Sequence, residues 1–146
     1  MQIPLMNSRA LKYLWAAPCT AVGALIGGAI CCFGASPRFV GGVIEIGFVN
    51  RNHPGARALF QLPFSGITFG HVVLAPTHEY QATLRQHERV HVSQYERWGL
   101  LFFVLYPANS LFQLYRGRRP YFDNYFEAQA RAHEDPSNFA ATSSEA

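Results

Sequence analysis

The order of apolar and polar residues divides the central part of the chain into a β-rich half and a helical half. Residues 37–76 are rich in β-branched and aromatic side chains, with strand-like segments at 38–40, 43–49 and 67–74. A turn or loop at 50–55 separates the last two segments, and Pro76 is expected to end the third. We therefore expect a small antiparallel or mixed sheet of two to four strands.

The next segment has a helical period. From Thr77 or His78 onward, apolar residues and two histidines recur every three or four positions, while Arg85, Arg89 and Glu96 fall on the opposite, solvated side. The inward face of this predicted helix comprises Leu84, His87, His91, Gln94 or Tyr95, and Trp98.

A second apolar run, Trp98 to Tyr115, has no charged residue but is interrupted at Pro107–Ser110. Because proline breaks or kinks a helix, we predict a helical hairpin or a sharp kink, with the chain turning back at Pro107. A loop follows at 116–120, and a last helix begins near Asp123–Asn124. Residues 135–146 are typical of a flexible tail.

The N-terminal segment is the most apolar part of the chain. Residues 13–37 carry no charge, which exceeds the ~20 residues needed to cross a bilayer, and Arg9 and Lys12 precede them. Gly23 and Gly27 have the GxxxG spacing that permits close helix approach. Three interpretations stay open: a membrane anchor, a signal peptide, or a buried helix whose Val22, Leu25, Ile26, Ala29, Ile30 and Phe33 follow helical spacing.

Composition favours a protein that buries much of itself or contacts a membrane. Charged residues make up 14% of the 146 residues, against ~25% in typical soluble domains. The net charge is only +3, and no nucleic-acid-binding motif is present. The three cysteines all lie in the apolar N-terminal segment without a CxxC motif, so we expect buried or lipid-facing thiols.

The predicted helix contains the motif His87-Glu88-Arg89-Val90-His91. Residues four apart lie on one helix face, so the two imidazoles are placed to bind one zinc ion. Glu88 then lies where a general base for a metal-bound water is needed. The motif predicts a catalytic metal site, and the alternative is a pair of hydrogen-bonded core histidines.

A catalytic zinc needs a third protein ligand. The metzincin pattern HExxHxxGxxH fails, because Gln94 and Arg97 replace its glycine and last histidine. Glu127 on the last helix is the best candidate, with Asp123, His133 and Glu134 as weaker ones. Alternatively, Glu127 belongs to a capping box with Asn124.

The pair of motifs HERVH (87–91) and NYFEAQA (124–130) resembles the gluzincin group of zinc metallopeptidases. This resemblance implies a minimal strand-then-helix core with His87, His91 and Glu127 as zinc ligands and Glu88 as base. It also implies that segment 66–74 supplies an edge strand that pairs with the substrate. Arg131 departs from the family, which has an acidic or small residue there, and Asp123 is an alternative orienting partner for a histidine.

A donor that stabilises the oxyanion is also expected. The candidates for this or another substrate contact are His71, Tyr95, Tyr121 and Tyr125, and the sequence does not choose among them.

These observations predict an α+β protein with an apolar N-terminal helix (1–36), a minimal zincin-like domain (37–134) and a tail (135–146). The expected function is a membrane-associated zinc peptidase acting on peptide or protein substrates, in a bacterium at the inner membrane. A homo-oligomer or a partner protein would complete its cleft. The alternatives are a catalytically silent metal-binding or scaffold protein, and a structural membrane protein in which the motif is accidental.

Overall fold

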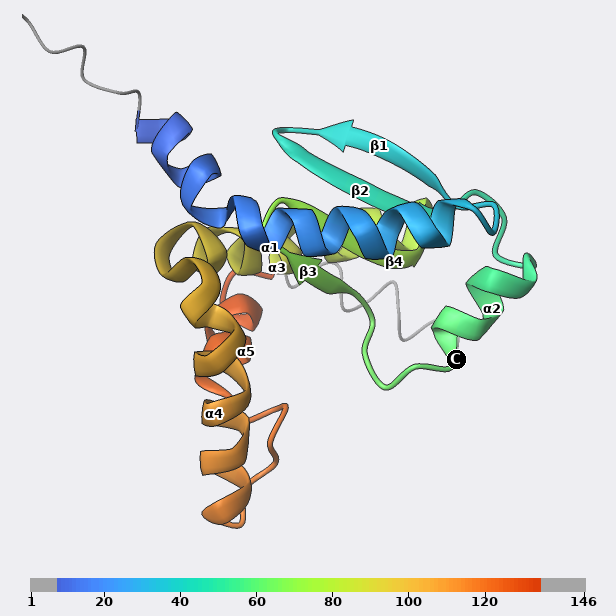
Figure 1. Cartoon of the computed structure of the whole chain (residues 1–146). Helices are drawn as coiled ribbons and strands as arrows, with labels where there is room; N and C mark the ends of the chain where they lie inside the picture. Colours follow the sequence, from blue (N-terminus) through green and yellow to red (C-terminus); the bar gives the residue numbers. More distant parts are fainter. Residues whose placement is uncertain (1–7, 135–146) are drawn as a thin grey trace, which may run out of the picture.

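The computed structural model describes residues 8–134 and has the predicted α+β fold (Figure 1). A four-stranded mixed sheet has the order β1-β2-β4-β3, in which β2 and β4 are parallel and the two outer pairs are antiparallel. The predicted tail at 135–146 lies outside the described residues. The elements are α1 (Ser8–Cys31), β1 (Ser36–Val40), β2 (Val43–Phe48), α2 (Pro54–Phe60), β3 (Ile67–Phe69), β4 (Val72–Thr77), α3 (His78–Trp98), the 3-10 turn η1 (Gly99–Leu101), α4 (Phe102–Tyr115) and α5 (Tyr125–Arg131).

The β-rich region differs from the sequence expectation in three places. Segment 67–74 is two antiparallel strands, because Gly70 adopts a φ of 59° and turns the chain. Strand β4 continues through Pro76, at the point where its pairing with β2 shifts register and a missing N–H is tolerated. Part of the expected loop begins helix α2, since Pro54 occupies the first turn and the His53 side chain accepts a hydrogen bond from the Gly55 N–H.

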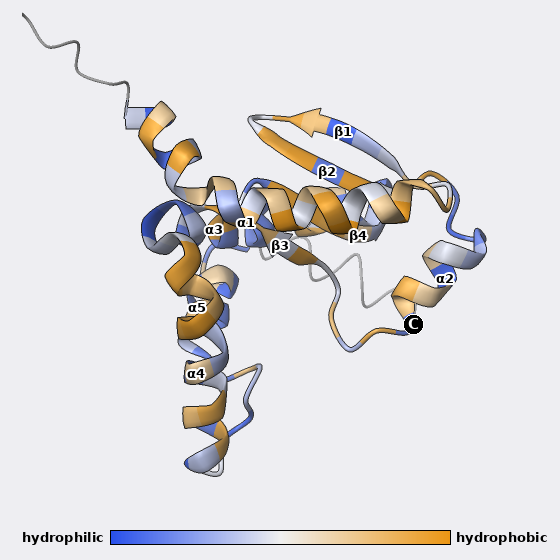
Figure 2. Ribbon diagram, viewed as in Figure 1, coloured by the Kyte–Doolittle hydropathy of each residue, from blue (hydrophilic) through white to orange (hydrophobic). Residues whose placement is uncertain are grey.

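Helix α1 covers one face of the sheet, and its glycines make this contact. A Cβ on Gly23 would lie 2.8 Å from the Cβ atoms of both Phe69 and Val72, and one on Gly27 would lie 2.2 Å from Ile46 Cδ1. The two glycines of the GxxxG motif therefore allow the sheet, and not another helix, to approach α1 closely. The large apolar side chains point outward: Leu25 is 76% exposed. Figure 2 shows hydrophobic residues along this helix and along α4.

Helix α3 covers the other face of the sheet. The Thr77 side chain caps its first turn by accepting a hydrogen bond from the Tyr80 N–H, as the expected start at 77 or 78 requires. The Gln81 side-chain amide donates to the Val73 carbonyl, and Val92 packs on Val73. The sheet is thus enclosed between α1 and α3.

The turn after α3 lies at Gly99, not at Pro107. Gly99 has a φ of 54°, and a Cβ there would lie 2.7 Å from Trp15 Nε1 of α1, so both conformation and space require glycine. Pro107 lies inside the continuous helix α4, whose 14 residues span roughly 21 Å at ~1.5 Å per residue, too short to cross a bilayer alone. The chain returns through the loop after Tyr115, and α5 then packs on α3.

Candidate metal centre

Three side chains from two helices meet between α3 and α5. His87 Nε2 and His91 Nε2 are 3.1 Å apart, as expected for an i, i+4 pair on one face. Glu127 brings its Oε2 atom within 3.3 Å of His87 Nε2 and its Oε1 atom within 3.3 Å of His91 Nε2. All three residues are buried. These spacings match the ~3.3 Å that separates donor atoms around a tetrahedral zinc ion with ~2.0–2.1 Å bonds.

Glu127 does not form the capping box that was its alternative role. Asn124 caps α5 through its own Oδ1, which accepts a hydrogen bond from the Phe126 N–H. The Glu127 carboxylate turns toward α3, where Tyr106 donates a hydrogen bond of 2.6 Å to Oε1. Within residues 8–134, the buried Oε2 atom has no hydrogen-bond partner. An unmatched carboxylate oxygen facing two imidazole nitrogens fits a divalent cation.

The outer ring nitrogens of both histidines are held by acceptors. His87 Nδ1 lies 2.6 Å from Glu134 Oε1, and His91 Nδ1 lies 2.8 Å from Gln94 Oε1. If each Nδ1 donates to its acceptor, each Nε2 is left with a lone pair directed at the common point. Metal-binding histidines in proteins are oriented in this way.

The partner of His87 is therefore Glu134, not the residue at position 131 and not Asp123. Arg131 donates from its guanidinium to the Phe122 carbonyl, and Asp123 accepts from the Arg119 backbone N–H. Glu134 lies in the turn that follows α5, three residues beyond its last residue Arg131, and from there its carboxylate reaches His87 on α3. Gln94 also ties α3 to α5, since its amide donates to the Phe126 carbonyl and to Gln129.

Glu88 lies beside the three donors without joining them. Its Oε2 atom accepts a hydrogen bond of 2.6 Å from Thr68 on strand β3, and a Cβ on Gly66 would lie 2.7 Å from its Oε1. Gly66 thus leaves the room that this buried carboxylate occupies. Thr68 was not among the residues expected in the site. Its position between Ile67 and Phe69 is the sequence feature that could have revealed it, because alternating side chains of a strand point to opposite faces of the sheet.

Two of the four candidate substrate-contact residues line the cavity around the donors, namely Tyr95 and Tyr121. His71 lies elsewhere: it stacks on Tyr13 at 4.0 Å between ring centroids, and its Nε2 is 3.1 Å from Glu96 Oε1. Tyr125 is 61% exposed and points away. Neither side chain lines the cavity, because His71 lies in the β3–β4 turn and Tyr125 in the exposed first turn of α5.

Of the weaker ligand candidates, His133 is directed away from the donors. Its Nδ1 atom bonds the Gln129 carbonyl at the end of α5. Tyr106 was missed by the sequence analysis. It lies one position before Pro107, where the chain was expected to turn back. Helix α4 instead continues through this point, and the Tyr106 hydroxyl donates to Glu127.

The charges of the site stabilise one another. Burial would raise the pKa of the Glu127 carboxyl, yet the facing imidazoles of His87 and His91 hold that pKa below its ordinary value. Burial likewise disfavours the imidazolium of His87, but the surrounding carboxylates raise its pKa. Burial and then the Glu127 charge raise the pKa of both Tyr106 and Tyr121, so both hydroxyls stay protonated donors.

The donors open into a cavity of about 540 Å³, a size typical of small-ligand sites. Its polar groups gather at one end, around His87, His91, Glu88 and Glu127. The remaining wall is mostly apolar, and its aromatic side chains come from strand β3, the loop before it, and helix α4: Phe64, Phe69, Phe102, Phe103 and Tyr106. The cavity thus combines a polar centre with an apolar approach.

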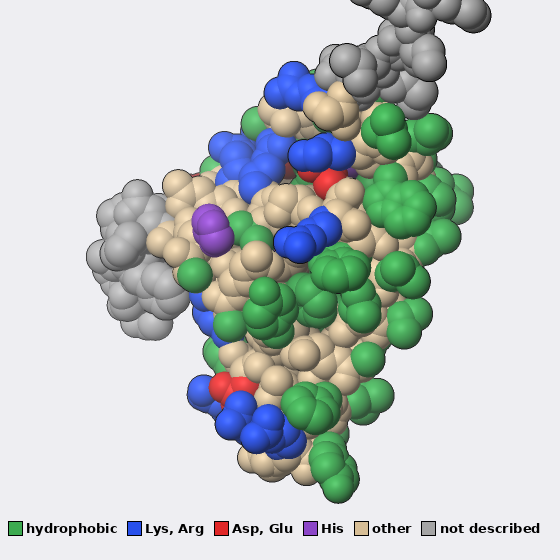
Figure 3. Space-filling view, turned by 90° about the vertical axis from the view of Figure 1, so that its left-hand side faces the viewer, with side chains coloured by type: hydrophobic (Ala, Val, Ile, Leu, Met, Phe, Trp, Pro, Cys, Tyr) green, Lys and Arg blue, Asp and Glu red, His purple; other side chains and the backbone are tan. Residues whose placement is uncertain are grey.

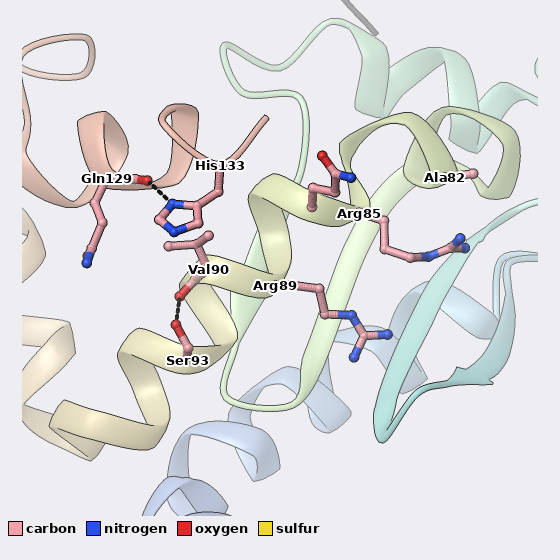
Figure 4. A pocket seen from close by; sticks show the side chains of 8 residues that line it. Ala82, Arg85, Arg89, Val90, Ser93, Gln129 and His133 are labelled. Atoms are coloured by element: carbon pink, nitrogen blue, oxygen red, sulfur yellow. Dashed lines mark hydrogen bonds between the residues drawn. The ribbon is translucent and has the colours of Figure 1, made fainter. Parts of the chain in front are cut away.

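A larger hollow, of about 690 Å³, lies on the other side of α3 (Figure 4). Its charged side chains, Arg85 and Arg89, extend toward the β1–β2 hairpin. Arg85 forms two hydrogen bonds with the Glu45 carboxylate, at 2.8 and 2.9 Å, and Arg89 donates to the carbonyls of Val40 and Gly41. These guanidinium groups bind the hairpin. His133 also lines this hollow, but no group of three or more metal-binding side chains meets there among the described residues.

Comparisons with protein-family models, with curated proteins and with solved structures found no match. Function is therefore inferred from the geometry of this site.

Proposed function

We propose that this protein is a zinc-dependent hydrolase, most specifically a metallopeptidase. The observation that carries the proposal is the convergence of His87, His91 and Glu127, with Glu88 alongside and outside the donor set. Two imidazoles and one carboxylate are the donor set of catalytic zinc sites, which keep a position for water or substrate. The resemblance of both motifs to the gluzincins supports the same function.

Zinc bound by these donors would polarise the scissile carbonyl and lower the pKa of a water toward ~7. Glu88 is placed to take a proton from the attacking water as its oxygen adds to the carbonyl carbon. The same carboxyl then passes this proton to the amine as the C–N bond breaks. Thr68 holds the Glu88 carboxylate in place by its hydrogen bond.

Tyr121 is the favoured donor to the oxyanion. It lines the cavity and stays protonated beside the anionic carboxylates; its hydroxyl interacts with Glu127 as well, whereas the hydroxyl of Tyr106 is held by a hydrogen bond of 2.6 Å to Glu127 Oε1. The edge strand β3 supports the binding of an extended peptide, because an edge strand offers unpaired backbone groups for strand addition.

The test is the change Glu88→Gln. We expect one zinc per chain in both wild type and variant, measured by elemental analysis. Hydrolysis of a mixed quenched-fluorescent peptide library should fall by about 10²–10⁴-fold in the variant. Equal cleavage by both proteins contradicts the peptidase; zinc without cleavage in either protein points to the silent metal-binding alternative.

We also propose that the protein is membrane-associated. Helix α1 is long and apolar enough to cross a membrane, and only 22% of its most apolar window is buried in the protein. Its buried contacts with the sheet run along the helix, so crossing would carry unpaired strand edges into hydrocarbon. We therefore propose that α1 lies in the plane of the membrane surface and does not cross the membrane.

The charge distribution supports this placement. Figure 3 shows hydrophobic side chains gathered along its right-hand side. This side corresponds to the front of the molecule in Figure 1, where α1 lies. A basic cluster lies at the lower end of the same view. Arg116, Arg118 and Arg119 follow the apolar end of α4, where anionic headgroups would meet them.

Vesicle flotation tests the membrane proposal. Wild type should float with vesicles containing phosphatidylglycerol, and Leu25→Glu should lower the bound fraction at least severalfold. Gln86→Glu adds the same charge on the solvent face of α3 and should leave binding unchanged. Equal loss in both variants, or no binding by wild type, contradicts the proposal.

A further inference from the structure

Strand β3 separates two hollows because its side chains alternate between the faces of the sheet. Thr68 points toward α3, where it donates a hydrogen bond to Glu88 in the metal-side cavity. The Cβ atom of Phe69 is directed to the opposite face, where it lies against Gly23 of α1, and its ring packs on Phe103 at 6.1 Å between centroids, so that Phe69 borders both hollows. Ile67 lies on the same side as Phe69 and packs against the core cluster beneath α1.

The second hollow lies on this α1 side and is almost entirely apolar. Its volume is about 230 Å³, and its walls come from α1, α2, the loop before β3, and the sheet. No titratable side chain of residues 8–134 lines it. The side chains that shape it are Ile26, Ile30, Leu59, Phe64, Ile67 and Phe69.

The two hollows adjoin the same stretch of chain. Phe64, Gly66, Ile67 and Phe69 line both of them, so an extended segment beside β3 would pass between the two. The α1-side hollow is smaller than the ~300 Å³ at which small-molecule pockets usually begin. It has the size and character for one apolar side chain.

We propose that this apolar recess, defined by Ile26, Ile30, Leu59, Phe64, Ile67 and Phe69, is a specificity subsite for the peptide substrate. The inference rests on the proposed peptidase function. A substrate strand paired with the free edge of β3 sends successive side chains to opposite faces of the sheet. One side chain enters the metal-side cavity, and its neighbour along the substrate enters the recess, which selects a large apolar residue such as Leu or Phe.

Ile26 and its neighbour Leu25 provide a matched pair of variants. Ile26 is 39% exposed at the wall of the recess, whereas Leu25 is 76% exposed and lines none of the hollows described above. Neither residue touches the metal donors. Ile26→Trp fills the recess, Ile26→Ala enlarges it, and Leu25→Trp adds the same bulk to the same helix without touching it.

The experiment measures kcat/KM for peptides varied at each position around the scissile bond, with the zinc-loaded protein. At one position wild type should prefer Leu or Phe over Ala. Ile26→Trp should lower kcat/KM for those preferred peptides by about tenfold and leave Ala peptides within about twofold, as expected for changes in one apolar pocket. Ile26→Ala should shift preference toward larger side chains. Leu25→Trp should match wild type, because the assay contains no membrane for Leu25 to contact.

The outcomes separate the two proposals. An unchanged preference in both Ile26 variants, or an equal shift in Leu25→Trp, overturns the subsite while Glu88-dependent hydrolysis leaves the peptidase standing. Absence of any Glu88-dependent hydrolysis overturns the peptidase and the subsite with it. Binding of a Leu-containing product peptide to Glu88→Gln, weakened by Ile26→Trp, gives the same answer without turnover.

Discussion

Helix α3 borders a hollow on each of two sides, and the smaller hollow is the better candidate for a functional site. On one side Arg85 and Arg89 line about 690 Å³, but each guanidinium is already bound to the β1–β2 hairpin. On the other side His87 and His91 line about 540 Å³ and face a Glu127 oxygen that has no hydrogen-bond partner in the described chain. The difference teaches that unmatched, converging donors indicate a ligand site better than volume does.

The largest effect is expected from removing one donor on the metal side. Glu127→Ala leaves two imidazoles, and zinc content should fall from about one per chain to near zero, since a catalytic zinc site needs three protein ligands. Elemental analysis after gel filtration measures this. Arg89→Ala, on the other side of α3, should keep its zinc; loss of zinc in both variants would erase the distinction between the two sides.

A smaller effect is expected from the partner of His87. Glu134→Gln keeps the size of the side chain but weakens the hold on Nδ1, so zinc affinity should drop by about 10–100-fold. Competition with a fluorescent chelator measures the affinity. Glu79→Gln, at the exposed first turn of α3, is the matched control and should bind zinc as wild type does. Equal affinities in the two variants would remove Glu134 from the site.

On the other side of α3, the expected effect is on stability alone. Arg85→Ala removes both hydrogen bonds that the buried Glu45 carboxylate accepts and leaves only the Arg89 guanidinium, 3.8 Å away. Loss of such hydrogen bonds to a buried acceptor costs about 1–3 kcal/mol. Urea unfolding should show this loss in the free energy of unfolding with zinc content unchanged. Arg118→Ala, at an exposed loop position, should change stability little. A loss of zinc in Arg85→Ala would mean that the two sides are coupled.

The smallest effect concerns the α1 face of the sheet. Gly23→Ala places a Cβ 2.8 Å from two strand side chains and should destabilise the fold by about 1 kcal/mol despite the better helix propensity of alanine. Gly28→Ala meets nothing within 4 Å and should stabilise by about 0.5–1 kcal/mol. Thermal unfolding of the metal-free proteins measures both. The same sign for the two variants would contradict the packing of α1 on the sheet.

Much of the site follows from local sequence. The i, i+4 histidines, the strand before their helix and the Asn124 cap before Glu127 are short-range features, which hydrophobic periodicity and capping chemistry reveal directly. For the same reason the α+β fold, the start of α3 and the start of α5 agree with expectation. The convergence of Glu127 with His87 and His91 agrees with the expectation, which rested on a later helix that the chain brings back toward the motif.

The sequence by itself identified which residues could hold a metal ion and which helices carry them. Only the tertiary structure decided what those helices touch. The turn at Gly99 depends on Trp15 of a distant helix, and the glycine face of α1 is buried because a sheet, not a helix, lies against it. Such features depend on contacts between residues far apart in the chain. These contacts produce no hydrophobic periodicity and no capping motif in the local sequence. For this reason the local sequence did not show that Glu134 and Tyr106 contact the donor residues, or that His71 and Tyr125 lie outside the cavity.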